Sequence, residues 1–110
     1  PFSIDLSGKV VLLTGASSGI GLGIARQFAR AGATLVGCGL ESVHDAGPFR
    51  SVVQEESGHL PLYLTTDVTQ PVDLDRLVEK TVAAFGRIDI LASNAGTNVF
   101  RGSAECTEAD

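Results

Sequence analysis

The segment TGASSGIG, which begins at Thr14, contains three glycines and two serines and is the part of the sequence best suited to binding an anion. It follows an apolar run and precedes an amphipathic stretch, so it would form a turn between a strand and a helix. There, Gly15 permits a tight turn, Gly19 lets the backbone approach a pyrophosphate, and Gly21 lets the helix pack closely on the sheet. The free N–H groups and partial positive charge of the helix start favour a phosphate.

Two serines inside this turn, Ser17 and Ser18, would add hydroxyl donors. No Lys followed by Ser or Thr comes after the glycines, so the pattern is not that of a P-loop. A glycine-rich turn that binds no ligand is the alternative, but this set of glycines and serines would be a poor choice for packing alone. The spacing therefore predicts a phosphate-binding turn.

The chain alternates short apolar runs with amphipathic stretches, which is typical of a parallel α/β sheet. Strands are expected at residues 9–14, 33–38, 60–66 and 88–92. Helices are expected at residues 20–31 and 72–85, with a short one from residue 48 and the start of another at residue 107. Together they predict the first half of a Rossmann-type, doubly wound α/β fold, with four parallel strands in the order 3-2-1-4 between layers of helices.

The two longer predicted helices have one apolar face each. In the helix at 20–31, the residues expected to face the sheet are Ile20, Ile24, Ala25, Phe28 and Ala29. Arg26 and Arg30 fall outside that face and are expected to point to solvent. In the helix at 72–85, the expected apolar face consists of Leu74, Leu77, Val78, Val82 and Phe85.

Composition and charge argue against several classes of protein. The chain has 110 residues, of which 44% are hydrophobic and 19% charged, an ordinary balance for one globular domain. Its net charge of -5 and lack of basic runs argue against nucleic-acid binding. Its apolar runs are far shorter than the ~20 residues that span a bilayer. With no signal-like N-terminus, we expect a cytoplasmic protein that binds no membrane. Cys38 and Cys106 lack metal-ligand spacing, so no metal site is expected.

The GxxxGxG spacing of the glycine-rich turn resembles the cofactor motif of the short-chain dehydrogenase/reductase family. Two further motifs resemble that family and occur in the same order. Asp67-Val68 directly follows the third predicted strand, and Ser93-Asn94-Ala95-Gly96 is similar to the family's NNAG element, with Ser93 in place of the first Asn. The resemblance covers nearly the whole chain and implies an oxidoreductase that uses NAD(H) or NADP(H).

The resemblance also implies how these residues would hold the cofactor. Asp67 would accept a hydrogen bond from the adenine amino group, Asn94 would brace the central sheet, and the backbone of Ala95 and Gly96 would lie along the cofactor ribose. The residues predicted to bind the cofactor are Gly15, Ser17, Ser18, Gly19, Ile20, Gly21, Gly39, Leu40, Asp67, Val68, Asn94, Ala95 and Gly96.

Discrimination between NAD and NADP normally depends on the end of the second strand, where an acidic residue favours NAD and a basic one NADP. Gly39 and Leu40 occupy those positions, and neither carries a charge. Glu41 lies about 20 residues past the glycine turn and could reach the ribose; a solvated loop carboxylate is the alternative. No Arg or Lys lies in the turn or among residues 39–43 to pair with a 2′-phosphate. The sequence therefore favours NAD.

The family's catalytic Ser, Tyr-x-x-x-Lys pair and Asn would all follow the fourth strand, so no catalytic residue is expected within this chain. Tyr63 is the one tyrosine, and Asp67 stands where the motif requires Lys, so Tyr63 is expected to be structural. We interpret residues 1–110 as the incomplete N-terminal part of a single-domain NAD(P)-binding enzyme.

The resemblance predicts hydride transfer between a nicotinamide and a secondary alcohol or its ketone, in a homo-oligomer such as a tetramer or dimer. Residues 2–9 faintly resemble the start of bacterial sugar-acid and sugar-alcohol dehydrogenases, which makes a sugar or polyol a candidate substrate. A non-catalytic dinucleotide-binding module is the alternative function. A SAM-dependent methyltransferase also has a glycine-rich turn, but the motifs at Asp67 and Asn94 fit it poorly.

Overall fold

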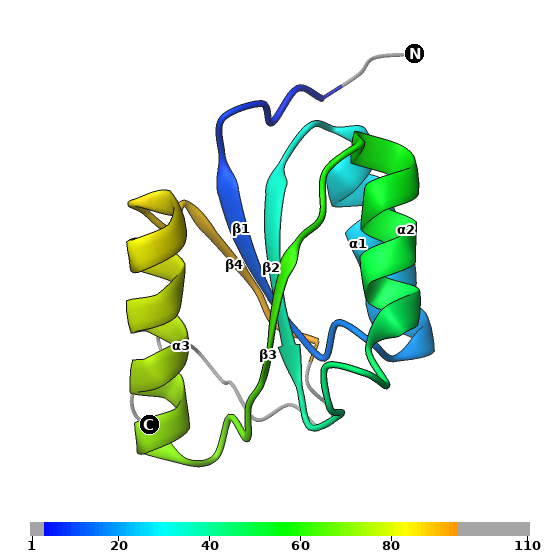
Figure 1. The fold of residues 1–110 in the computed structure, drawn as a ribbon. Helices are drawn as coiled ribbons and strands as arrows, with labels where there is room; N and C mark the ends of the chain where they lie inside the picture. The colour runs from blue at the N-terminus through cyan, green and yellow to red at the C-terminus, as the bar shows by residue number, and fades with distance from the viewer. Residues whose placement is uncertain (1–3, 95–110) are drawn as a thin grey trace.

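A computed structural model of the protein describes residues 4–94, which form alternating strands and helices (Figure 1). In chain order the elements are β1 (Val10–Thr14), α1 (Gly19–Arg30), β2 (Thr34–Gly39), α2 (Gly47–Ser57), β3 (Leu62–Thr65), α3 (Pro71–Phe85) and β4 (Ile90–Ala92). None of the helices described is both long enough and apolar enough to cross a membrane. The helix expected to begin at residue 107 lies outside the described residues.

The strands form one parallel sheet in the order β3-β2-β1-β4, which confirms the predicted fold class and strand order. In Figure 1, α1 and α2 cover one face of the sheet and α3 covers the other. The carboxyl ends of all strands therefore lie at the same edge of the sheet, where ligands of doubly wound folds bind.

The central strand β1 has the sequence VVLLT and is buried at every position. Val11 and Leu13 contribute to the core beneath α1 and α2, whereas Val10 and Leu12 contribute to the core beneath α3. Alternate residues of a strand point to opposite faces, so a strand between two layers of helices must be apolar throughout. This explains why the strongest apolar run in the sequence forms the middle of the sheet.

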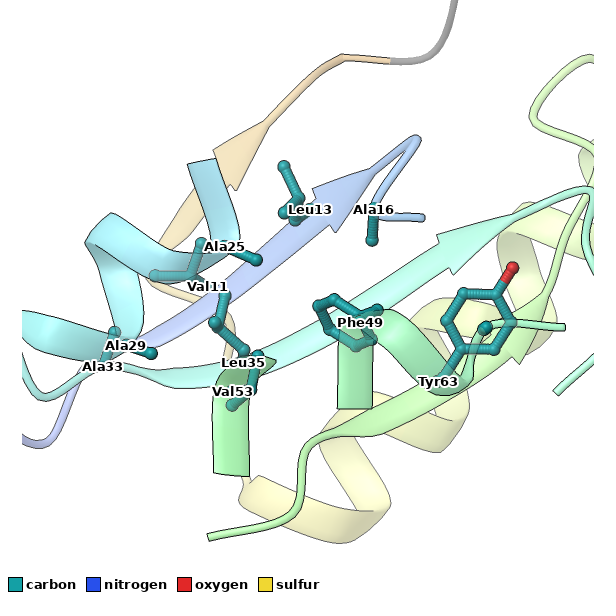
Figure 2. Close-up of a cluster of buried hydrophobic side chains, with 11 residues drawn as sticks. Val11, Leu13, Ala16, Ala25, Ala29, Ala33, Leu35, Phe49, Val53 and Tyr63 are labelled. Atoms are coloured by element: carbon teal, nitrogen blue, oxygen red, sulfur yellow. The ribbon is translucent and has the colours of Figure 1, made fainter. Parts of the chain in front are cut away.

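Small side chains allow α1 to lie close to the sheet. Its buried residues are Gly21, Ala25 and Ala29, which are four residues apart and share one face. The larger space beneath α2 is filled by Phe49, which is fully buried and lies near Tyr63, with 6.0 Å between the ring centroids (Figure 2). A Cβ on Gly37 would lie 2.5 Å from the Phe49 ring, so a glycine in β2 makes room for this side chain.

Two arginines of α1 lie outside its sheet-facing side and reach solvent, as predicted, but they also form ion pairs with α2, which lies beside α1. Arg26 Nη1 lies 2.7 Å from Glu56 Oε2, and Arg30 Nε lies 3.0 Å from Glu56 Oε1. The pKa of the Glu56 carboxyl is held below its usual range by the hydrogen bonds from Arg30 and Arg26. The sequence periodicity identified most of the sheet-facing side of α1, but Ile20, which was expected to face the sheet, is 72% exposed at the start of the helix. The periodicity gave no sign of the second neighbour, α2.

The apolar face of α3 is only partly buried. Leu77 and Thr81 are buried against the sheet, but Val78, Val82 and Phe85 remain exposed to solvent. The predicted apolar face is therefore covered only in part within the described residues. Helical spacing shows which side chains share a face, and the width of the contact with the sheet determines how many of them are covered.

Element boundaries differ by a few residues from those predicted. The third strand begins at Leu62, just after Pro61, whose missing N–H cannot join the sheet. The fourth begins at Ile90, because Asp89 instead bonds to the start of β1 through its N–H and carboxylate. The helix expected from residue 48 runs over eleven residues and ends at Gly58, which has a left-handed backbone with φ of 81°.

Candidate functional site: the turn between β1 and α1

The glycine-rich turn lies at the carboxyl end of β1 and is tightly closed against α1. Gly15 has φ of 66°, a left-handed conformation that other residues rarely adopt. A Cβ on Gly21 would lie 1.9 Å from the carbonyl oxygen of Gly15, far inside any permitted contact. The structure thus shows the tight turn predicted at Gly15 and the close packing predicted at Gly21.

The start of α1 presents two backbone donors that the protein leaves free. Within residues 4–94, no acceptor receives the N–H of Gly19 or of Ile20, the first two residues of the helix. The next N–H, that of Gly21, donates to the hydroxyl of Ser18, the N-cap residue, at 3.0 Å. Neighbouring free N–H groups at the positive end of a twelve-residue helix form an anion site.

The two serine hydroxyls of the turn already have acceptors in the protein. Ser18 Oγ donates to the Gly15 carbonyl at 3.0 Å and also accepts from Gly21. Ser17 Oγ donates to Glu41 Oε1 at 2.6 Å. Because a hydroxyl carries one proton, the predicted donors Ser17 and Ser18 shape the turn in this structure, and the free donors are backbone N–H groups.

The end of β4 is tied to the same turn through Asn94. Its backbone N–H donates to Thr14 Oγ1 at 2.9 Å. Its side-chain Nδ2 donates to the Gly15 carbonyl at 3.3 Å and to Ser18 Oγ at 3.1 Å. Asn94 therefore links the end of β4 to β1 at the point where the chain passes from β1 into the glycine turn. The predicted residues Ala95 and Gly96 lie outside the described residues.

The end of β2 lies beside the turn, as predicted for Gly39 and Leu40. The N–H of Ala16 donates to the Cys38 carbonyl at 3.2 Å, and the Leu40 side chain is 73% exposed. The Glu41 carboxylate approaches the turn at Ser17, and the hydrogen bond from that serine holds the pKa of the Glu41 carboxyl below its usual range. A negative charge therefore lies next to the glycine-rich turn.

The third predicted element, Asp67-Val68, follows β3 at the same edge of the sheet. Asp67 Oδ1 accepts from the Thr69 hydroxyl at 2.6 Å and from the Thr69 N–H at 3.0 Å. The Thr69 hydroxyl bond is the main reason that the pKa of Asp67 is lowered. Val68 packs against the core beneath α3, so its contribution to a site would come from its backbone.

Tyr63 is structural in the described part of the chain, as expected. Its side chain is 6% exposed, and its hydroxyl donates to the Glu41 carbonyl at 3.0 Å.

Burial raises the pKa of the nearby Cys38 thiol to about 12, so this group is not a nucleophile at neutral pH. Among residues 4–94, no group of three His, Cys, Asp or Glu side chains could hold a metal ion.

Sequence reasoning missed the residues that tie the site together. Thr14 receives the Asn94 N–H, and Tyr63 and Thr65 both donate to the carbonyl of Glu41. These contacts join residues far apart in the chain. Their one signal in the sequence is position: apart from Tyr63, which lies inside β3, they end or follow strands whose carboxyl ends meet at one edge.

The comparisons with known proteins agree with this geometry. The family described as short chain dehydrogenase matches residues 9–110. A hydroxynaphthalene reductase-like protein Arp2 from Metarhizium anisopliae is 39% identical over 108 residues, which cover 96% of this chain and 39% of that protein. The chain thus spans well under half the length of this relative.

Two solved structures combine a similar fold with a sequence identity above 30%. The L-sorbose reductase from Gluconobacter frateurii, complexed with NADPH and L-sorbose, has a TM-score of 0.79 and 37% identity, covering 99% of this chain and 40% of its own. An NAD+-bound xylitol dehydrogenase has a TM-score of 0.77 and 32% identity, covering 84% of this chain and 35% of its own. On the family match and these likenesses, the chain belongs to the short-chain dehydrogenase family.

Proposed function

We propose that the protein is an NAD(P)-dependent oxidoreductase and that residues 1–110 are the N-terminal part of its cofactor-binding domain. The observation that carries this proposal is the pair of free N–H groups at Gly19 and Ile20, in a turn where Gly21 leaves no room for a side chain. This arrangement fits the pyrophosphate of a dinucleotide, because backbone donors and the helix dipole favour a closely bound phosphate.

The described residues fit the parts of such a cofactor in order along the sheet edge. The turn between β1 and α1 would hold the phosphates, the end of β2 at Gly39 and Leu40 would lie along the adenosine ribose, and Asp67 would accept from the adenine. Asn94 would brace the end of β4 against the turn, and the backbone of Ala95 and Gly96 would lie along the cofactor ribose. The bound nicotinamide would supply the hydride chemistry, and the protein would supply binding and orientation.

We propose NAD as the preferred cofactor and a secondary alcohol or its ketone as the substrate. The acidic Glu41 beside the turn supports the first point. Relatives named for L-sorbose and xylitol support a sugar or polyol as the substrate class. The catalytic residues would lie beyond residue 110, since Tyr63 is buried within the sheet.

The experiment is an assay of the full-length gene product with NAD(H) and NADP(H) against a panel of polyols, sugars and hydroxy acids, followed by nicotinamide absorbance. The proposal predicts turnover with at least one member of the panel. Cofactor binding without turnover across the panel would favour the non-catalytic dinucleotide-binding module. The absence of any dinucleotide binding would contradict both functions.

We also propose that the full-length protein is a cytoplasmic homo-oligomer, a dimer or tetramer. Support for the oligomer comes from the family membership. Light scattering of the purified full-length protein gives its molar mass directly. A mass equal to that of one chain would contradict this part of the proposal.

A further inference from the structure

The loop between β3 and α3 holds Asp67 by its backbone as well as by its side chain. The Asp67 N–H donates to Asp73 Oδ2 at 2.9 Å, and the Asp67 carbonyl accepts from the Gln70 N–H, also at 2.9 Å. On the side chain, Oδ1 accepts from the Thr69 hydroxyl at 2.6 Å and from the Thr69 N–H at 3.0 Å. Residue 67 is therefore fixed through its N–H, its carbonyl and one carboxylate oxygen.

Asp73 reaches further back along the chain than a residue at its position in a helix usually does. It is the third residue of α3, where a side-chain acceptor often bonds to the N–H of the N-cap residue. Here the N–H of the N-cap residue Gln70 already donates to the Asp67 carbonyl, and Asp73 bonds to the N–H of Asp67 itself. Asp73 Oδ1 lies 2.9 Å from Arg76 Nη2. This ion pair offsets the like charge of Asp67, so two carboxylates can share one loop.

The second carboxylate oxygen of Asp67 is left for a ligand. Among residues 4–94, no Lys, Arg or His nitrogen lies within 4.0 Å of this carboxylate, and its Oδ2 accepts no hydrogen bond. The bonds from Thr69 hold the pKa of the carboxyl below its usual range, so the group is ionised at neutral pH. The N–H of Thr66 donates to the Gly39 carbonyl at 2.7 Å, which joins the start of the loop to the end of β2.

We propose that Asp73 is a positioning residue for the recognition of adenine, because it holds the backbone of Asp67 where the free carboxylate oxygen can accept from the adenine amino group. Without this acceptor the Asp67 N–H loses its partner, and the peptide group before Asp67 can turn and carry the carboxylate away. Asp73 would thus govern which base is bound without touching it. The inference rests on the proposed function, because it takes Asp67 to face the adenine of a bound dinucleotide.

The test compares NADH with reduced nicotinamide hypoxanthine dinucleotide, each bound to the full-length gene product and followed by fluorescence of the bound nicotinamide. Hypoxanthine carries an oxygen in place of the amino group of adenine, so a carboxylate that faces this position repels it. The ratio of the two dissociation constants measures recognition of the amino group. A general loss of folded protein weakens both compounds equally and leaves the ratio unchanged.

Four variants separate the roles of the carboxylates. Asp73→Ala removes the acceptor, Asp73→Asn removes the charge but keeps an amide oxygen, and Asp67→Ala removes the carboxylate that would face the base. Asp75→Asn is the matched control, because Asp75 is an exposed carboxylate on the same helix, two residues from Asp73.

A second measurement needs no cofactor. The Asp67 amide should exchange its hydrogen with solvent about tenfold faster, or more, in Asp73→Ala than in the wild-type protein, because it loses a charged acceptor. Asp75→Asn should leave this rate unchanged. Equal exchange of the Asp67 amide in Asp73→Ala and the wild-type protein would overturn the inference.

The wild-type protein should bind NADH about tenfold more tightly than the hypoxanthine compound, and Asp67→Ala should bring that ratio close to one. Asp73→Ala should lower the ratio by about threefold or more, Asp73→Asn by a smaller factor, and Asp75→Asn not at all.

A wild-type ratio in Asp73→Ala would overturn the inference even if both compounds bound more weakly, because Asp73 would then only stabilise the fold. A wild-type ratio in Asp67→Ala would also overturn it. Both results would leave the proposed function standing, whereas failure of the wild-type protein to bind either dinucleotide would overturn the proposed function as well.

Discussion

Replacing Gly21 with alanine tests whether the close contact between α1 and the glycine-rich turn is essential. The new Cβ would lie 1.9 Å from the Gly15 carbonyl oxygen, so the two backbones would have to separate by about 1.5 Å to reach ordinary contact at 3.4 Å. Little adjustment is possible, because that carbonyl also accepts from Ser18 and Asn94. Overpacking of this kind costs about 1–3 kcal/mol, or more when backbone atoms clash.

Gly23, two residues further along the same helix, provides a matched control. A Cβ there would meet no atom within 4 Å, and the position is exposed. Alanine in an exposed helix interior is favoured over glycine by about 0.5–1 kcal/mol. Gly21→Ala should therefore lower the free energy of unfolding while Gly23→Ala raises it, although the substitution is the same.

The assay is urea unfolding of the two variants and the wild-type protein, followed by circular dichroism, together with titration by NADH. Only Gly21→Ala should weaken NADH binding, because only that variant displaces the N–H groups at the start of α1. Equal stability of the two variants would refute the packing argument. Wild-type affinity for NADH in Gly21→Ala would refute the assignment of the turn as the phosphate site.

Three other predictions follow from the cores and the ion pairs. Phe49→Ala should lower the free energy of unfolding by about 3–5 kcal/mol in the same urea assay, because the fully buried ring would leave a cavity; a loss below about 1 kcal/mol would contradict this. Cys38 should resist iodoacetamide in the native protein, as judged by mass spectrometry of its peptide, and react after denaturation, because a pKa of about 12 leaves almost no thiolate; rapid native labelling would show that its burial is wrong. Glu56→Gln should lower the melting temperature at neutral pH more than Glu55→Gln, whose side chain is 71% exposed against 19% for Glu56. Because the pKa of Glu56 is depressed in the folded state, its stabilisation exists above the unfolded pKa of about 4.3 and is lost as the pH falls through the folded pKa. A difference between the two variants that persists at lower pH would contradict the ion-pair explanation.

The fold could be predicted from the sequence because its elements have simple local signals. The run VVLLT in β1 is apolar at every position, as a strand covered on both faces must be. The glycine motif following it fixed the βα unit and, with it, the strand order. The signal was weaker for α2, where only Phe49 and Val53 of eleven residues are buried.

What the sequence could not predict depends on neighbours in space. The ion pairs of Arg26 and Arg30 exist because α2 lies beside α1, and nothing in the periodicity of either helix reports that. The sequence likewise could not predict that part of the apolar face of α3 is exposed to solvent. Helical spacing shows which residues share a face, but it does not show which neighbouring element covers them. At the site, the sequence left open whether Glu41 reaches the ribose or is a solvated loop carboxylate, and its bonds to Ser17 and Tyr63 needed the three-dimensional structure.

The central claim is that a dinucleotide binds with its phosphates at the start of α1. The most direct measurement is the change in backbone amide chemical shifts of the full-length gene product as NADH is added. The account predicts that the largest shifts include the amides of Gly19 and Ile20, which have no acceptor among residues 4–94. Saturable NADH binding that leaves these two amides unmoved, or no binding at all, would contradict the claim.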